Sequence, residues 1–393
     1  MRNLYWPKKA FDTVNHDVLL NKLQHYGFRG TISDWFSSYL TNRKQTTDIN
    51  GYISEQQLTT CGVPQGSVLG PLLFLIYMND IQYSSTKFKF FLFADDTNIL
   101  YADKHLRSLE SVANAELTKV YEWLTANRLT LNIKKSNYVI FRPYQKTLIF
   151  QPKIYMYDNE KQSQSKLECN EYVKYLGMLL DKNLSFKNHI DLITIKISKT
   201  VGMIAKLRHF LPRKILIQIY NSLIGPYISY AISVWGSADK CHLNKILILQ
   251  KRALRFIYFA EWKEHAIPFF LNADILPVNF LYYENVCSLM HDVRHKTAPE
   301  NIIDLFTDIK SVHSYNTRSS TSHNFYIKQS KLQIQYKSFS RLGARIWNDI
   351  PVSLREKPKR IFKSELHRAL LNVLKTHDDY LDISQIGKAV KLL

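Results

Sequence analysis

The sequence contains little cysteine, and the cysteines it has are widely separated. The four cysteines form no Cys-x-x-Cys pair, which excludes a zinc ribbon and fits a reducing compartment. Cys287, His291 and His295 share one face of an expected helix and are a possible set of metal ligands. Any helix face produces a spacing of four, however, so ordinary packing is the favoured explanation of these residues.

Long apolar runs are also missing. The longest, Pro71–Met78, is too short to cross a bilayer, and the first residues contain no apolar stretch typical of a signal peptide. We therefore expect an intracellular protein of the nucleus or cytoplasm, neither secreted nor bound to a membrane. Hydrophobic residues make up 46% of the 393 residues, which predicts a folded globular protein of two or three domains.

Acidic residues are scarce relative to basic ones. The chain has 53 Lys and Arg against 33 Asp and Glu, a formal net charge of +20 that is spread along the sequence. Such a surplus indicates a polyanionic partner, with nucleic acid as the first candidate. A membrane surface is the second candidate, but no single basic amphipathic helix carries the excess.

Two adjacent acids, Asp95 and Asp96, lie between two apolar runs in the segment Phe88–Asp103. The runs predict two buried strands, and the polar break at Ala94–Asn98 predicts the tight connection of a hairpin. Two carboxylates at the end of a rigid hairpin suit a hard divalent cation such as Mg²⁺. A solvated Asp-Asp turn is the commoner origin of such a pair, so the pair alone leaves both interpretations open.

A glycine- and proline-rich loop precedes the apolar helix expected from about Ser67, within the segment Cys61–Ile81. Such a loop at a helix N-terminus lets backbone N–H groups approach a phosphate or a sugar closely. The loop lacks the Lys-Ser/Thr ending of a P-loop, which argues against a Walker-type NTPase. A purely structural turn explains the loop as well as a binding role does.

The other patterns predict strands and helices in the first half and helices in the second. Thr46–Thr60 predicts an exposed hairpin turning at Asn50-Gly51. Further strands are expected over Leu129–Phe141 and over 170–181, the latter turning at Gly177. Helices are expected over Ser108–Asn127, His189–Phe210, Lys214–Trp235 (divided at Pro226), Leu243–Phe259, Asn279–Arg294, Ser338–Asn348 and Lys359–Lys375. Basic faces recur on the helices after Phe186; these are either solvated or a surface for a nucleic-acid backbone.

Five segments follow one another in a specific order: KKAFDTVNHDVLLNKL from Lys8, CGVPQGSVLGPLLF, FADDTNI, LTLNIKKSNYVIF and YVKYLGMLLD. In this order and spacing they resemble the palm motifs of reverse transcriptases, most closely those of non-LTR (LINE-type) retrotransposons of the jockey and CR1 style. The resemblance is specific from Lys8 to about Gly236. It is weaker to about Leu374, where Tyr315–Ser320 and Arg341–Pro351 are similar to the tail of such elements.

The resemblance implies an α+β fold with three parts. Residues 1–182 would form a reverse-transcriptase palm, an antiparallel sheet with helices on one face, lacking most of the fingers. Residues 183–260 would form a helical thumb whose basic faces contact the duplex backbone. Residues 261–393 would form a mostly helical region to which the residues assign no chemistry.

The resemblance also implies roles for single residues. Asp95 and Asp96 match the catalytic acids that hold Mg²⁺ (or Mn²⁺). The nucleotide would be bound by residues matching the sugar-selecting, loop and triphosphate positions, namely Phe11, Pro64, Gln65, Gly66 and Lys135. Leu176 and Gly177 match the turn that grips the primer. The implied partners are an RNA template, a DNA primer and deoxynucleoside triphosphates.

One position departs from the family pattern. The family has a third metal-ligating Asp six residues before the position of Asp12, and here that residue is Trp6. An indole offers only an N–H donor and cannot ligate Mg²⁺. Few residues precede Trp6, so we also expect an N-terminally truncated chain without fingers or an endonuclease domain. Three hypotheses follow: an RNA-directed DNA polymerase, a remnant that binds nucleic acid without catalysis, or a repurposed binding protein. For the activity of this chain, Trp6 favours the second, and no residue specifically supports the third.

Overall fold

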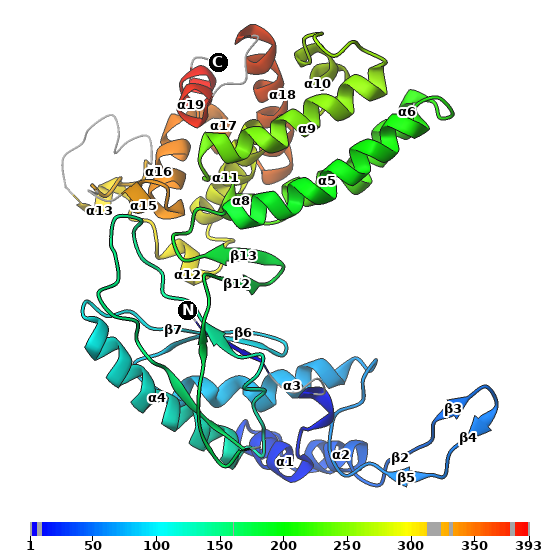
Figure 1. Cartoon of the computed structure of the whole chain (residues 1–393), viewed down its shortest axis with the longest axis vertical. Coiled ribbons are helices and arrows are strands. Elements are labelled where there is room, and N and C mark those ends of the chain that lie inside the picture. Colours follow the sequence, from blue (N-terminus) through cyan, green and yellow to red (C-terminus); the bar gives the residue numbers. More distant parts are fainter. Residues whose placement is uncertain are drawn as a thin grey trace. The chain divides into compact units, whose positions relative to one another are not determined.

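The computed structural model describes residues 2–5, 10–159, 161–312, 324–329, 333–377 and 382–391. The chain divides into two compact units (Figure 1). The first unit comprises Met1–Tyr175 with Asp181–Asn183, and the second comprises Leu176–Leu180 with Leu184–Leu393. Within the described residues, no helix combines the length and the apolar character needed to cross a membrane.

A five-stranded sheet forms the centre of the first unit, in the order β11–β8–β1–β7–β6. The strands are β1 (Arg2–Tyr5), β6 (Lys89–Phe93), β7 (Asp96–Leu100), β8 (Asn137–Tyr138) and β11 (Glu168–Cys169). β1 pairs antiparallel with β7 and β8, and β6 pairs antiparallel with β7. β11 runs parallel to β8. The prediction of an antiparallel sheet is therefore wrong at this edge, because a long crossover containing the hairpin β9 (Tyr155–Asp158) and β10 (Ser163–Lys166) returns the chain in the same direction.

One face of this sheet packs on helices. Its buried residues join a single hydrophobic cluster with residues of α1 (His16–His25), α3 (Leu69–Met78) and α4 (Leu106–Ala126). Along β6 the side chains alternate: Phe90 and Leu92 pack against the cluster, whereas Phe91 and Phe93 are exposed. One face of β6 is therefore covered and the other is exposed, whereas in β7 the successive residues Thr97 and Asn98 are both buried.

Lys22 connects three helices of the first unit, α1, α3 and α4. Its Nζ donates to the backbone oxygen of Tyr77 and to Oδ1 of Asp80, each at 2.6 Å. The same ammonium lies 4.8 Å from the ring centre of Tyr77 and 4.9 Å from that of Trp123. Burial lowers the pKa of Lys22, and Asp80 opposes this change. The result is a fixed contact between α1, α3 and α4 at the C-terminal end of α3.

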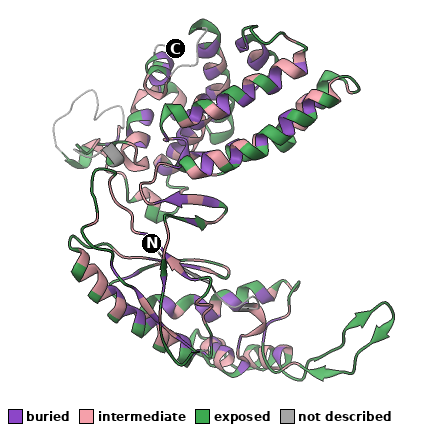
Figure 2. Cartoon of the chain, in the orientation of Figure 1, coloured by how far each residue is buried: buried purple, intermediate pink, exposed green. Residues whose placement is uncertain are grey.

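The segment between α2 (Thr31–Leu40) and the glycine-rich loop forms a projecting hairpin, as predicted. Its strands are β2 (Lys44–Gln45), β3 (Asp48–Ile49), β4 (Tyr52–Ile53) and β5 (Gln57–Leu58), and all their residues are exposed (Figure 2). Asn50 and Gly51 have φ of 55° and 88°, the left-handed values that a two-residue type I′ turn requires.

Two other predictions of secondary structure hold only in part. The strand expected over Leu129–Phe141 is limited to Asn137–Tyr138, because the preceding residues form a turn in which Ser136 N donates to Asn132 O. The helical stretch over Lys214–Trp235 was expected to divide at Pro226, and it forms α6 (Arg213–Leu223), α7 (Gly225–Ser229) and, after a second break that was not expected, α8 (Ile232–Trp235). Pro226 and a left-handed Ala231 (φ 51°) interrupt it.

The second unit is helical. Long helices α5 (Lys187–Leu207) and α9 (Lys240–Tyr258) pack along each other. α11 (Val278–Arg294) is central, with α16 (Phe339–Asp349), α18 (Lys359–His377) and α19 (Ile383–Lys391) packed around it. The segment Tyr315–Ser320, which resembles an element tail, lies outside the described residues.

Packing, rather than metal ligation, accounts for the Cys287, His291 and His295 stripe on α11. Cys287 is fully buried, and burial raises its pKa. His291 Nε2 lies 2.9 Å from Lys357 O, and His295 Nε2 lies 3.3 Å from Arg355 O. Among the described residues, no group of three or more potential ligand side chains is suited to a metal ion.

Candidate functional site

The two predicted catalytic acids lie at the turn of the β6–β7 hairpin. Phe93 and Asp96 are the closing pair, and the connection consists of Ala94 and Asp95 alone. Ala94 has a positive φ of 48°, as one central residue of a tight hairpin turn must. The predicted break of Ala94–Asn98 is therefore too long, because β7 already begins at Asp96. Asp95 is exposed, whereas Asp96 is half-buried in the strand.

The environment of Asp96 disfavours its own negative charge. Burial and the neighbouring charge of Asp95 raise the pKa of Asp96, and Lys174 partly offsets them. Burial and the charge of Asp96 also raise the pKa of Tyr175. Lys174 and Tyr175 both belong to β12 (Tyr172–Tyr175), so this strand lies close enough to the hairpin for its charges to affect Asp96. A divalent cation bound by both carboxylates would relieve this repulsion, which fits the donor set to Mg²⁺ or Mn²⁺.

β1 brings the start of the sequence to the same end of the sheet. Its backbone pairs Leu4 with Thr97 and Tyr5 with Asp96. Trp6 is the next residue in the sequence and lies outside the described residues. The last paired residue of β1 is thus the partner of one hairpin acid.

The glycine-rich loop is held against η1 (Ala10–Asp12). Val63 N donates to Phe11 O at 2.8 Å, and Gln65 Nε2 donates to Asp12 Oδ1 at 2.8 Å. The Phe11 ring packs on Phe74 of α3, with ring centres 4.6 Å apart. Hydrogen bonds from the loop to η1 therefore bring two predicted nucleotide-binding residues, Phe11 of η1 and Gln65 of the loop, close together.

Two glycines permit this close approach. Gly62 has φ +91°, and a Cβ there would lie 2.8 Å from Asp12 Cα. A Cβ on Gly70 would lie 2.5 Å from Pro64 O. That oxygen also accepts a 2.7 Å hydrogen bond from Ser67 Oγ, which in turn accepts one from Gly70 N at 2.9 Å. The loop backbone at Pro64 is therefore fixed by contacts that a larger residue would disrupt.

The remaining predicted residues occupy two turns and the loop tip. Gly66 is an exposed loop residue with φ +82°. Lys135 is exposed, and its backbone N donates to Asn132 O at 3.2 Å. Leu176 and Gly177, with φ of 43° and 82°, form the two-residue turn that leads into β13 (Met178–Asp181). Tyr230 Oη donates to Leu176 O at 2.5 Å and stabilises this turn within the second unit.

Comparison with known proteins identifies the family. A family model described as "Reverse transcriptase (RNA-dependent DNA polymerase)" matches residues 7–180. Residues 7–180 are a reverse transcriptase domain. The chain is 30% identical over 266 residues to the RNA-directed DNA polymerase from mobile element jockey of Drosophila melanogaster, covering 65% of this chain and 28% of that protein. It is 28% identical over 263 residues to the probable RNA-directed DNA polymerase from transposon X-element of the same species, with the same coverage of each.

A more distant relative belongs to another element. The Pol polyprotein from type-1 retrotransposable element R1 of Bradysia coprophila is 25% identical over 264 residues, which cover 64% of this chain and 24% of that protein. The chain thus spans less than a third of the length of these relatives. These similarities confirm the predicted family, the reverse transcriptases of non-LTR retrotransposons.

The reverse transcriptase domain also contains residues that the sequence alone did not single out. Asp12 holds the Gln65 amide, and the buried His16 places Nε2 2.7 Å from Gly62 O. Lys174 and Tyr175 interact electrostatically with Asp96. A buried histidine in the apolar pattern of α1 was one available signal. No sequence pattern indicated the effect of β12 on Asp96, because that effect depends on two segments that are distant in the sequence.

Proposed function

We propose that the β6–β7 hairpin is the metal-binding centre of an RNA-directed DNA polymerase that uses an RNA template, a DNA primer and deoxynucleoside triphosphates. The observation that carries this proposal is the pair Asp95 and Asp96 at the hairpin turn, where burial and mutual repulsion raise the pKa of Asp96. In this proposal residues 1–182 form the palm and residues 183–260 form the thumb. The role of residues 261–393 stays unassigned.

Asp95 and Asp96 would hold the metal, since each offers hard carboxylate oxygens. Bound Mg²⁺ or Mn²⁺ would supply Lewis acidity at the primer 3′-hydroxyl and at the leaving pyrophosphate. The protein's own contribution is to fix both acids on a short rigid turn. Lys174 supplies a positive charge that favours the ionised form of Asp96.

The remaining roles concern the nucleotide and the primer. Phe11, supported by Phe74, would present a fixed apolar surface beneath the sugar and so exclude a 2′-hydroxyl. Gln65, oriented by Asp12, would contact the nucleotide or the template with its neighbours Pro64 and Gly66. Lys135 would approach the triphosphate from its exposed turn. Leu176 and Gly177 would grip the primer, with the turn stabilised by Tyr230.

Trp6 would leave this centre impaired. It occupies the position of the family's third metal-ligating Asp, directly after the strand residue that pairs with Asp96. Loss of a carboxylate from a two-metal site removes charge that stabilises the transition state. The second candidate function, binding of nucleic acid without catalysis, rests on this same residue.

The chain should extend an oligo-dT primer on poly-rA only weakly with Mg²⁺ or Mn²⁺, because one metal ligand is replaced. The measurement is incorporation of labelled deoxynucleotide into the primer over time. Asp95→Ala, which removes one proposed metal ligand, is the negative control. Asp34→Ala, which removes an exposed acid of α2, is the matched control. Robust extension that Asp95→Ala abolishes would overturn the impaired state while keeping the assignment of the centre.

Mn²⁺ binding by the hairpin should weaken as the pH falls from 8 to about 4. Only the ionised carboxylate ligates the metal, and the raised pKa of Asp96 makes this loss begin at a higher pH than for an ordinary Asp. Electron paramagnetic resonance of free Mn²⁺ measures the binding. Asp96→Asn should abolish most of it, while Asp34→Asn should leave the curve unchanged. Equal affinity at both ends of the pH range would contradict a carboxylate site.

A further inference from the structure

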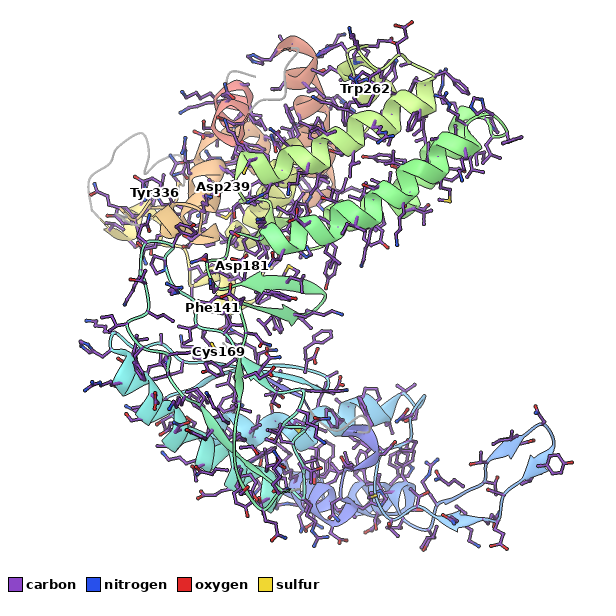
Figure 3. All side chains as sticks on the ribbon, viewed as in Figure 1. Phe141, Cys169, Asp181, Asp239, Trp262 and Tyr336 are labelled. Atoms are coloured by element: carbon purple, nitrogen blue, oxygen red, sulfur yellow. The ribbon has the colours of Figure 1, made fainter. Side chains whose placement is uncertain are left out.

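The ends of α5 and α9 carry a patch of rings and arginines that the reverse transcriptase domain does not include. We call it the tip surface and define it by Arg208, Phe210, Arg213, Arg252, Phe259 and Trp262. It lies entirely in the second unit. Figure 3 labels Asp239 before the start of α9 and Trp262 just beyond its end.

Contacts between rings and guanidinium groups join its two segments. The Arg208 guanidinium lies 5.3 Å from the ring centre of Phe256 and 5.2 Å from that of Phe259. Arg213 lies 4.6 Å from the ring centre of Tyr258, and Arg252 lies 5.5 Å from that of Phe256. The turn after α5 and the end of α9 therefore form one continuous surface.

Three large rings of the tip surface remain open to solvent. Phe210 is 83% exposed, Trp262 is 70% exposed and Phe259 is 55% exposed. Phe259 also ends α9 in the left-handed conformation, with φ 55°, at a position where glycine is the usual residue. Clustered exposed rings of this kind mark an interaction site.

The charge around these rings selects the partner. Residues 206–214 contain four Lys or Arg and no acid, and residues 251–265 contain four Lys or Arg and two Glu. Among the described residues, no carboxylate lies within ion-pair distance of Arg208, Arg213 or Arg252. Their guanidinium groups make cation–π contacts with aromatic rings and, in the described part of the chain, are not paired with carboxylates. A polyanion that also carries flat groups matches both features.

We propose that the tip surface binds unpaired RNA, with bases stacked on Phe210, Phe259 and Trp262 and phosphates contacting the arginines. Duplex strands hide their base faces, so exposed rings favour unpaired nucleotides. The choice of RNA rests on the proposed function, in which the template RNA enters unpaired and leaves paired with DNA.

The full chain is tested by fluorescence anisotropy with an unpaired RNA oligonucleotide and with an RNA–DNA duplex of equal length. Phe210→Leu combined with Trp262→Leu should weaken RNA binding by at least about tenfold, since a stacked base contributes about 1–3 kcal/mol. Duplex binding should change by less than about twofold. Phe210→Tyr with Trp262→Tyr should retain RNA binding, because both rings remain. Tyr144→Leu, at an 84% exposed ring of the first unit, is the matched control.

Salt dependence separates stacking from charge. Arg213→Gln and Arg252→Gln should each reduce the slope of log affinity against log salt by about 0.7, because each phosphate contact to a single strand releases that fraction of a counterion. The two leucine substitutions should lower affinity at every salt concentration and leave the slope unchanged. All these side chains are exposed, so the thermal unfolding midpoint should stay that of the unsubstituted chain.

Either of two results would overturn the proposal: wild-type RNA affinity in the leucine variant, or an equal loss of affinity for RNA and for duplex. Failure of the proposed function is a separate outcome. If no variant extends a primer but the leucine variant still loses RNA affinity, the tip surface stands and the polymerase assignment falls. If Asp95→Ala abolishes extension while the leucine variant binds RNA normally, the reverse holds.

Discussion

Replacing Trp6 with aspartate should raise primer extension on an RNA template by at least about 100-fold over the unsubstituted chain. In the proposed function the family's third metal-ligating Asp stands at this position, directly after Tyr5, which pairs with Asp96, and Trp6→Asp would restore that hard ligand. A gain of about 2.7 kcal/mol in transition-state stabilisation, within the several kcal/mol that metal charge supplies, gives this factor. Initial rates with saturating Mg²⁺ and deoxynucleotide measure it.

Matched variants separate ligation from bulk at this position. Trp6→Ala removes the indole without adding a carboxylate and should remain as weak as the unsubstituted chain. Trp6→Asp combined with Asp95→Ala should lose the gain, because the site again has two acids. An increase with Trp6→Ala equal to that with Trp6→Asp would show that the indole only blocks access, and no increase with Trp6→Asp would refute the missing-ligand explanation.

Replacing Arg355 with methionine should lower the free energy of unfolding of the second unit by about 3–5 kcal/mol. Arg355 is 6% exposed, and its guanidinium donates to Ile350 O at 2.7 Å, Asn324 Oδ1 at 2.7 Å and Asn348 O at 3.0 Å. Burial and the charge of Arg294 lower its pKa to about 10. Methionine would fill part of the volume and leave these three oxygens without their donor.

Urea unfolding followed by circular dichroism at 222 nm measures this loss. Arg355→Lys should cost nearly as much, because an ammonium cannot reproduce the planar fork that reaches three acceptors. Arg345→Met, at an exposed position of the neighbouring helix α16, should change stability by no more than about 0.5 kcal/mol. A change below about 1 kcal/mol for Arg355→Met would show that solvent replaces its hydrogen bonds.

Local chemistry made some parts of the fold predictable. The turns at Asn50-Gly51 and at Gly177 follow from residues that accept positive φ, and both form in the structure. Helices such as α4 and α18 follow from apolar spacing over several turns. Two-residue strands such as β8 and β11 carry no periodic pattern, so their parallel pairing could not be predicted from the sequence.

The candidate site likewise contains some features that the sequence predicted and others that it did not. The order of motifs led to the acids Asp95 and Asp96 and to the loop at Gln65, because these are contiguous segments. The Gln65–Asp12 hydrogen bond and the charge of Lys174 near Asp96 join residues far apart in sequence. Such pairs can be recognised only when the three-dimensional arrangement of the segments is known. The histidines of α11 show the opposite case, in which a regular spacing predicted a possible site that packing explains.

The central position of β1 also affects how the first unit folds. Its residue Arg2 pairs with both Ile99 and Tyr138, so the middle strand of the sheet must wait for partners synthesised much later. Contacts between such distant segments slow folding, because a long loop must close before any pairing energy is gained. During translation the β6–β7 hairpin can form first, since its strands are adjacent in sequence. We therefore expect the hairpin that carries both acids to form early in folding and β1 to be inserted beside it later.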